Sequence, residues 1–401
     1  MQVLFLSNRV SPGVFQSIFD MSPQKPGQQV QRFDGMMMKG LAENGCSVTA
    51  LSLPPVPRAA GGRYLAFPGD FEGAIRYVYI PVVNLPVVKQ IWARIAGFVA
   101  GARWARRTKG RDRIVICDAL SPTLSALGIA ISRFFQIKRM AVVTDLPSFL
   151  ALGAEKERGI RTVARRLFTS MSFGAMKKYD LYMLLTDEMS RVVNPHNKPY
   201  IVIEGMVDPS SLPAGNDIAR KARPPVILFA GALFEKYGLR MLAEGFLKSG
   251  VDAEMHFYGA GEMERELEAL SRKYDNIRFF GVVPNGEILR AELSATLLVN
   301  PRFSHEEYTK YSFPSKNMEY MMSGTPVLTT ALPGMPEEYR QYVYILENET
   351  AGGMAHALME IMSKPGSKLH DTGLKAQRFV AEHKNYKAQM GKVAAFIKGN
   401  M

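Results

Sequence analysis

Short apolar runs alternate with helical stretches along the first half of the chain. Runs with strand composition fall at 3–7, 47–52, 113–117, 140–144, 181–186 and 200–203. A long polar loop is expected after the first run, followed by a helix at about 28–44. Near-continuous apolar strands that alternate with helices are typical of a parallel sheet covered on both faces. The pattern predicts a doubly wound α/β domain.

The pattern stops at 208–225, which is rich in Pro, Ser and Gly, and then restarts. Six further strand candidates lie at 225–230, 253–258, 277–280, 296–300, 326–330 and 343–346. A breaker-rich segment between two periodic halves predicts a linker, and 401 residues exceed one ordinary core. We therefore expect a first domain at 1–212, a second at 213–375, and a C-terminal helix at 376–401 that caps the second domain or crosses back to the first.

The segment 311–327, YSFPSKNMEYMMSGTPV, is interpreted as a loop, a short helix and a buried strand. Pro314 suits the first turn of the helix, with Ser312 as its N-cap. A helix start binds anions because free N–H groups and the positive dipole end face outward. Lys316 adds a positive charge there, and Glu319 could accept hydrogen bonds from hydroxyl groups, although a solvent-facing glutamate is the plainer alternative. A helix start that binds phosphate and a carboxylate that binds a diol together indicate a nucleotide ligand.

Two glycine loops follow strands of the second half in the same way. Gly231 begins a loop that contains Lys236, and Gly259 and Gly261 end the next strand. Glycine lets a ligand approach the backbone closely, and a lysine can reach a phosphate. Each loop alone could be a plain turn with a solvated lysine. Three loops at the carboxyl ends of strands in one sheet favour one phosphorylated ligand.

The net charge of +13 is concentrated in the first half, where residues 1–212 carry 27 Lys and Arg against 15 Asp and Glu. This excess indicates an anionic partner. Residues 89–113 contain eight basic residues and one acidic residue, and apolar residues recur there at helical spacing. The segment predicts a membrane or acceptor surface formed by Trp92, Arg94, Arg103, Arg106 and Arg107. The alternative is a surface helix whose apolar stripe packs on its own domain. No nucleic-acid recognition motif accompanies the arginines.

Metal chemistry has little support in the sequence. The six histidines show no ligand spacing, and the two cysteines form no Cys-x-x-Cys pair, which favours a reducing compartment. The first residues read as a strand rather than a secretory signal, and no apolar run is long enough to suggest a membrane span. Asp118 and Asp145 each follow an apolar strand of the first half, so they could orient a hydroxyl acceptor; turn-capping is the usual role of such residues.

These features together resemble glycosyltransferase family 4, the group 1 glycosyltransferases, over nearly the whole chain. The correspondence runs in order through 231–238, 257–261 and 319–327, with 45–49 and 203–208 in the first half. The resemblance implies the GT-B architecture, two Rossmann-like domains facing a central cleft. It also places Glu319 on the ribose of a nucleotide sugar. Tyr311 stands where the family has a glutamate that meets the sugar.

The resemblance further implies a retaining, metal-independent transfer from a nucleotide-diphosphate sugar to a glycan or lipid-linked acceptor in polysaccharide or glycoconjugate synthesis. No cofactor is expected. The enzyme would be cytoplasmic, bound peripherally to the anionic inner face of the cytoplasmic membrane. The donor-binding set is predicted to comprise Gly231, Lys236, Gly259, Gly261, Tyr311, Phe313, Ser315, Lys316 and Glu319. A sugar-nucleotide epimerase of the same architecture and a catalytically idle binding subunit are the alternatives.

Overall fold

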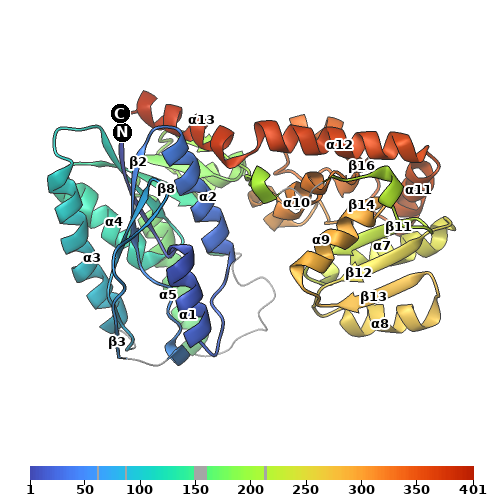
Figure 1. Ribbon diagram of the computed structural model, residues 1–401, viewed down its shortest axis with the longest axis horizontal. Coiled ribbons are helices and arrows are strands. Elements are labelled where there is room, and N and C mark those ends of the chain that lie inside the picture. The colour runs from blue at the N-terminus through green and yellow to red at the C-terminus, as the bar shows by residue number, and fades with distance from the viewer. Residues whose placement is uncertain (61–62, 86–87, 149–159, 212–214) are drawn as a thin grey trace. The chain divides into compact units, whose positions relative to one another are not determined.

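The computed structural model describes residues 1–60, 63–85, 88–148, 160–211 and 215–401, and side chains of 160–166 are outside that description. The chain divides into two compact units (Figure 1). Unit 1 comprises Met1–Glu204 and Tyr386–Met401, and unit 2 comprises Gly205–Asn385. The division therefore falls before the predicted linker at 208–225. The last helix, α13 (Tyr386–Gly399), belongs to unit 1.

Unit 1 is built on an eight-stranded sheet in the order β10-β9-β8-β7-β1-β2-β5-β4, parallel except for β4 against β5. Its strands are β1 (Gln2–Ser7), β2 (Ser47–Ser52), β4 (Asp70–Glu72), β5 (Ile75–Tyr79), β7 (Arg113–Asp118), β8 (Lys138–Val143), β9 (Leu181–Leu184) and β10 (Tyr200–Val202). A small antiparallel pair joins β3 (Tyr64–Leu65) and β6 (Val82–Val83). The six predicted strands of this half are confirmed.

The helices of unit 1 are α1 (Pro12–Met21), α2 (Gln29–Glu43), α3 (Val88–Arg107), α4 (Pro122–Phe135), α5 (Ile160–Met176), α6 (Asp187–Val193) and α13. Helix α1 lies where the sequence predicts only a polar loop, so that prediction is wrong. The Ser11 side chain accepts a hydrogen bond from the Val14 N–H, and Pro12 occupies the first turn, where its missing N–H does no harm. Residues that look like breakers here start a helix.

Unit 2 has a six-stranded parallel sheet in the order β13-β12-β11-β14-β15-β16, and all six predicted strands are confirmed. The strands are β11 (Val226–Ala230), β12 (Glu254–Tyr258), β13 (Ile277–Gly281), β14 (Leu297–Asn300), β15 (Val327–Thr330) and β16 (Tyr344–Leu346). The helices are α7 (Leu239–Ser249), α8 (Glu264–Lys273), α9 (Asn285–Ser294), α10 (Ser315–Ser323), α11 (Ala351–Met362) and α12 (Gly366–His383).

The central strand β11 shows why this sheet needs helices on both faces. Ile227 and Phe229 enter a core with α7, α8 and α11, whereas Leu228 and Ala230 enter a second core with α9, α10 and α12. Successive side chains of a strand point to opposite faces, so an unbroken apolar run must be covered twice. The carboxyl ends of the strands remain as the edge where loops can hold a ligand.

Candidate functional site

Helix α10 begins the candidate donor site in unit 2. It starts at Ser315 with Pro314 at the N-cap, and no N-cap side chain bonds to its first turn. Ser312 is therefore not the predicted cap: its hydroxyl donates to the Tyr308 carbonyl of the preceding turn at 3.3 Å. The first N–H groups of α10 thus have no side-chain acceptor from the cap and can receive an anion.

Two hydrogen-bonded contacts hold α10 against the sheet. The Asn300 amide donates to the Asn317 carbonyl oxygen at 2.6 Å, at the end of β14. The Tyr320 hydroxyl accepts from the Ala230 N–H at 2.8 Å and donates to the Ala230 carbonyl at 3.1 Å. The Tyr320 hydroxyl thus links the helix to the end of β11, a contact that the sequence pattern did not indicate. These bonds orient the start of α10 relative to the glycine loops.

Lys316 lies beside Gly231 and forms an ion pair with Glu319. The Lys316 ammonium pairs with the Glu319 carboxylate at 2.8 Å, one turn apart on α10. A Cβ placed on Gly231 would stand 3.9 Å from the Lys316 Cε. The Glu319 side chain is about half exposed and the Lys316 side chain less so. An exposed ion pair of this kind contributes about 0.5 kcal/mol, so a bound phosphate and ribose can separate it at little cost.

The glycine loops fit against one another without room for side chains. A Cβ on Gly259 would collide with the Gly231 carbonyl, and a Cβ on Gly261 with the Leu233 carbonyl. Gly259 also has φ of +126°, in the region that L side chains rarely adopt. The structure therefore brings the loops of Gly231, Gly259 and Gly261 side by side at the carboxyl ends of β11 and β12.

Three other predicted donor residues lie in distinct surroundings. The Lys236 ammonium lies over the rings of Phe234, Tyr237 and Tyr308, at 5.3, 5.6 and 5.8 Å from their centroids. Tyr311 is partly buried at the end of the short 3-10 turn Glu307–Tyr311.

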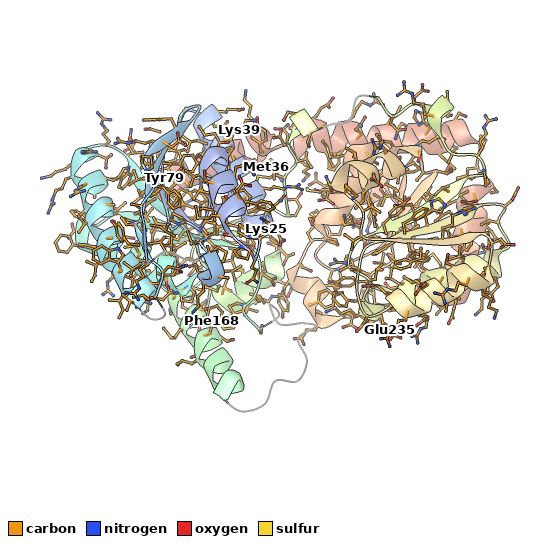
Figure 2. The ribbon with its side chains drawn as sticks, turned by 60° about the horizontal axis from the view of Figure 1, so that its bottom comes forward. Lys25, Met36, Lys39, Tyr79, Phe168 and Glu235 are labelled. Carbon is orange, nitrogen blue, oxygen red and sulfur yellow. The ribbon has the colours of Figure 1, made fainter. Side chains whose placement is uncertain are left out.

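Phe313 is buried in the core of unit 2, with its ring 5.0 Å from that of Tyr339. Figure 2 labels Glu235, the exposed residue before Lys236. Donor contacts of Lys236, Tyr311 and Phe313 stay predictions.

Glu292 is a carboxyl of this site that sequence analysis missed. It lies on α9, is only 5% exposed, and interacts electrostatically with Lys316 and Glu319. Burial raises the pKa of Glu292 from 4.5 to about 7; Lys316 lowers it and Glu319 raises it. Ile288, Glu292 and Ala295 follow the spacing of one helix face, so a charged residue on an apolar face was the available signal.

The predicted catalytic aspartates lie at the carboxyl ends of neighbouring strands of unit 1. The Asp118 carboxylate, at the end of β7, accepts from the Leu120 N–H, and the Asp145 carboxylate, just after β8, accepts from the Leu146 N–H. Burial raises the pKa of both carboxyls. Burial also raises the pKa of Asp34 on α2 well above its usual range, and the charge of Asp118 adds to this. Both predicted aspartates cap turns, and their catalytic role stays a prediction.

Helix α3 presents its large apolar residues outward. Its buried side consists largely of small residues: a Cβ on Gly97 would meet Leu127 and Ile80, and one on Gly101 would meet Ile131. The opposite side carries an exposed α3 stripe of Val88, Ile91, Trp92, Ile95 and Val99. Of the apolar residues predicted at helical spacing, Ile91 and Ile95 therefore do not pack on their own domain, whereas Ala102 does, because the close approach of α4 buries the glycine side.

Basic and aromatic side chains border the α3 stripe. The predicted surface residues Arg94, Arg103, Arg106 and Arg107 are all exposed. Phe134 of α4 is 68% exposed, and its ring lies 5.7 Å from that of Phe98 on α3.

Helix α5 carries further exposed apolar residues, including Phe168, labelled in Figure 2, and Met171. No described helix combines the length and low polarity needed to cross a bilayer.

Comparisons with known proteins place this site within a described family domain. Residues 224–364 match the family model of group 1 glycosyl transferases. No curated protein matches the chain.

Among solved structures, the chain is similar to a sucrose-phosphate synthase from Thermosynechococcus elongatus, with 14% identity, TM-score 0.64 and full coverage of both chains. It is also similar to the lipopolysaccharide outer core galactosyltransferase WaaB, with 12% identity, TM-score 0.59 and full coverage of both chains. HepE from Anabaena in complex with UDP matches over both full chains with 11% identity and TM-score 0.58.

The structural matches establish the GT-B fold, and the family match covers the loops of Gly231 and Gly259 and all of α10. The chain therefore has the GT-B fold, and its residues 224–364 form a domain that matches the group 1 glycosyl transferases.

Proposed function

We propose that this enzyme moves a sugar from a nucleoside diphosphate sugar to a glycan or lipid-linked acceptor in cell-surface polysaccharide or glycoconjugate synthesis. The start of α10 carries the proposal. Lys316 lies beside Gly231 and pairs with Glu319 there, and the first-turn N–H groups have no capping side chain. Diphosphate would lie on these N–H groups and Lys316, and the ribose hydroxyls would bond to Glu319. HepE, which shares the fold, has been solved with UDP-glucose, which supports a donor of this class.

The same groups suit the chemistry of transfer. Negative charge grows on the diphosphate as the sugar leaves, and N–H groups and an ammonium already in place stabilise that charge. We assign this role to the Ser315 turn, Lys316 and Lys236. The transfer retains the anomeric configuration and needs no bound metal. Asp118 and Asp145 orient the acceptor hydroxyl from unit 1.

Donor binding tests the assignment of Glu319. We expect UDP-glucose or GDP-mannose to bind the wild type by isothermal titration calorimetry, and Glu319→Ala to weaken binding by about 1.5–3 kcal/mol, the value of hydrogen bonds to a charged group. Glu360→Ala is a matched control, because Glu360 is an exposed helix glutamate paired with Lys364 at 2.8 Å. Equal affinity of Glu319→Ala and wild type would contradict the ribose assignment.

The exposed face of α3 supports a second part of the proposal, attachment to the inner face of the cytoplasmic membrane. Large apolar side chains point outward while glycines pack inward, and arginines border the stripe. A helix with this arrangement can lie in a bilayer interface, where apolar residues enter the acyl boundary and arginines meet anionic headgroups. This location would bring a lipid-linked acceptor to the enzyme.

Vesicle flotation tests the membrane assignment. Each arginine near an anionic surface is worth about 1 kcal/mol, so the Arg103/Arg106/Arg107→Ala variant should lose about 3 kcal/mol, more than a hundredfold in binding to phosphatidylserine vesicles. Arg265/Arg272/Arg290→Ala removes three exposed arginines of unit 2 and should float like wild type. Equal flotation of both variants would contradict the proposal.

A further inference from the structure

Glu292 is buried on α9, and among the residues that the structure describes no Lys, Arg or His forms an ion pair with it. Helix α9 packs against α10 and β11. From α10 the charged groups that act on Glu292 are Lys316 and Glu319, and the Tyr320 phenol also interacts with it. Strand β11 contributes only apolar residues. Lys316 is already paired with Glu319 at 2.8 Å, so the single attraction on the Glu292 carboxylate is shared.

The carboxyl-terminal end of α9 holds one more cation, which is occupied elsewhere. The Lys221 ammonium donates to the carbonyls of Leu293 and Ala295, both at 2.9 Å, and to the Thr325 hydroxyl at 2.8 Å. Lys221 therefore provides hydrogen bonds to the carbonyl groups at the end of α9. A buried carboxylate without its own partner is costly, and neutralisation by a proton is the usual response.

We propose that Glu292 is a positioning residue of the donor site and that it takes up a proton when a nucleoside diphosphate sugar binds at the start of α10. The inference rests on the proposed function, because it needs a diphosphate beside Lys316. The diphosphate draws the Lys316 ammonium and brings negative charge to the same turn. Both changes disfavour the Glu292 carboxylate, which accepts a proton from solvent and becomes a neutral carboxyl. No bond of the sugar changes in this step.

The proton balance of the free protein makes this uptake measurable near neutral pH. Burial, the largest cause, raises the pKa of Glu292 to about 7, so the free protein is divided between both protonation states there. Binding that raises the pKa further must draw protons from the buffer, and affinity must then fall as pH rises above about 7. A neutral residue at this position should remove both effects.

Calorimetry in two buffers of different protonation enthalpy tests the proposal, with UDP-glucose and GDP-mannose as probes. Their diphosphate groups are fully ionised and do not titrate near neutral pH, so proton uptake reports on the protein. We expect uptake approaching about one proton in wild type and none at this site in Glu292→Gln. The wild-type Kd should rise up to about tenfold per pH unit above about pH 7, whereas the variant's Kd stays flat. Glu287→Gln, an exposed glutamate on the same helix, should behave as wild type.

Two results would overturn the inference while leaving the proposed function intact. One is equal proton uptake by wild type and Glu292→Gln; the other is loss of binding by that variant at acidic pH, where it mimics the protonated wild type. Glu292→Met, neutral and similar in length, provides the same comparison if the glutamine variant does not fold. Failure of both sugars to bind wild type at any pH would instead refute the donor assignment and the inference together.

Discussion

The Glu292→Gln substitution replaces a buried ionisable carboxyl by a neutral amide of nearly the same shape, and it should stabilise unit 2 at alkaline pH. The folded protein holds the Glu292 proton up to about pH 7, whereas the pKa of the unfolded chain is near 4.5. The stability that this protonated group contributes is fully present below the unfolded pKa and is lost as pH rises through the folded pKa. Glutamine cannot lose a proton, so the variant keeps that stability.

The size of the effect follows from the pKa difference. A rise from 4.5 to about 7 corresponds to about 3 kcal/mol of unfolding free energy at 1.36 kcal/mol per pH unit. Glu292 is only 5% exposed, so solvent screening removes little of this value. Unit 2 spans 205–385, and for a domain of that size we expect a melting temperature about 6–12 °C higher in the variant at about pH 8.5, with little difference at about pH 4.5.

Thermal melts followed by far-UV circular dichroism measure the change. Both tryptophans, Trp92 and Trp104, lie in unit 1, so tryptophan fluorescence follows that unit and should show the same transition in both proteins. Glu287→Gln, on the same helix but exposed, should match wild type. A difference between Glu292→Gln and wild type that is the same at both pH values would refute the reasoning.

Four further predictions concern α10, α3 and the reaction. Tyr320→Phe leaves the buried N–H and C=O of Ala230 without their partner and should cost about 1–3 kcal/mol of unfolding free energy, measured by denaturant titration. Gly101→Leu forces a side chain against Ile131 and should destabilise unit 1 by about 1–3 kcal/mol, reported by tryptophan fluorescence. Val99→Ala alters an exposed side chain and should change stability by less than about 0.5 kcal/mol but reduce vesicle flotation. NMR of the product should show the same anomeric configuration as the donor sugar. The rate of sugar transfer should not change when EDTA is added.

Local patterns predicted all six strands of the unit 2 sheet and six of the eight strands of the unit 1 sheet, because a strand buried on both faces must be apolar throughout; they missed β4 and β5. Strand β11, Val226–Ala230, is such a run, and every residue in it is buried. Local patterns failed where a capped helix starts with residues that also break helices, as at Ser11 and Pro12 of α1. On α3 they left two alternatives open, because the fit of Gly97 and Gly101 against α4 decides which side is buried.

The candidate site was predictable where its contacts lie within one helix, and not where they depend on packing between elements. Lys316 and Glu319 are one turn apart on a single helix, so their meeting follows from helix geometry. Glu292 lies on another helix, and its approach to Lys316 depends on how α9 packs against α10. Ser312 looked like a cap from its position before Pro314, but its hydroxyl bonds to a carbonyl of the preceding turn. Such tertiary contacts leave only a weak trace in the sequence.

A crystal structure of the protein with UDP-glucose or GDP-mannose bound would test the donor site most directly. We predict diphosphate density at the first turn of α10, within hydrogen-bond distance of the Ser315 N–H and the Lys316 ammonium, with the ribose hydroxyls on the Glu319 carboxylate. Lys316 and Glu319, now paired at 2.8 Å, would then have separated. A sugar nucleotide bound away from α10, with that ion pair intact, would contradict the account.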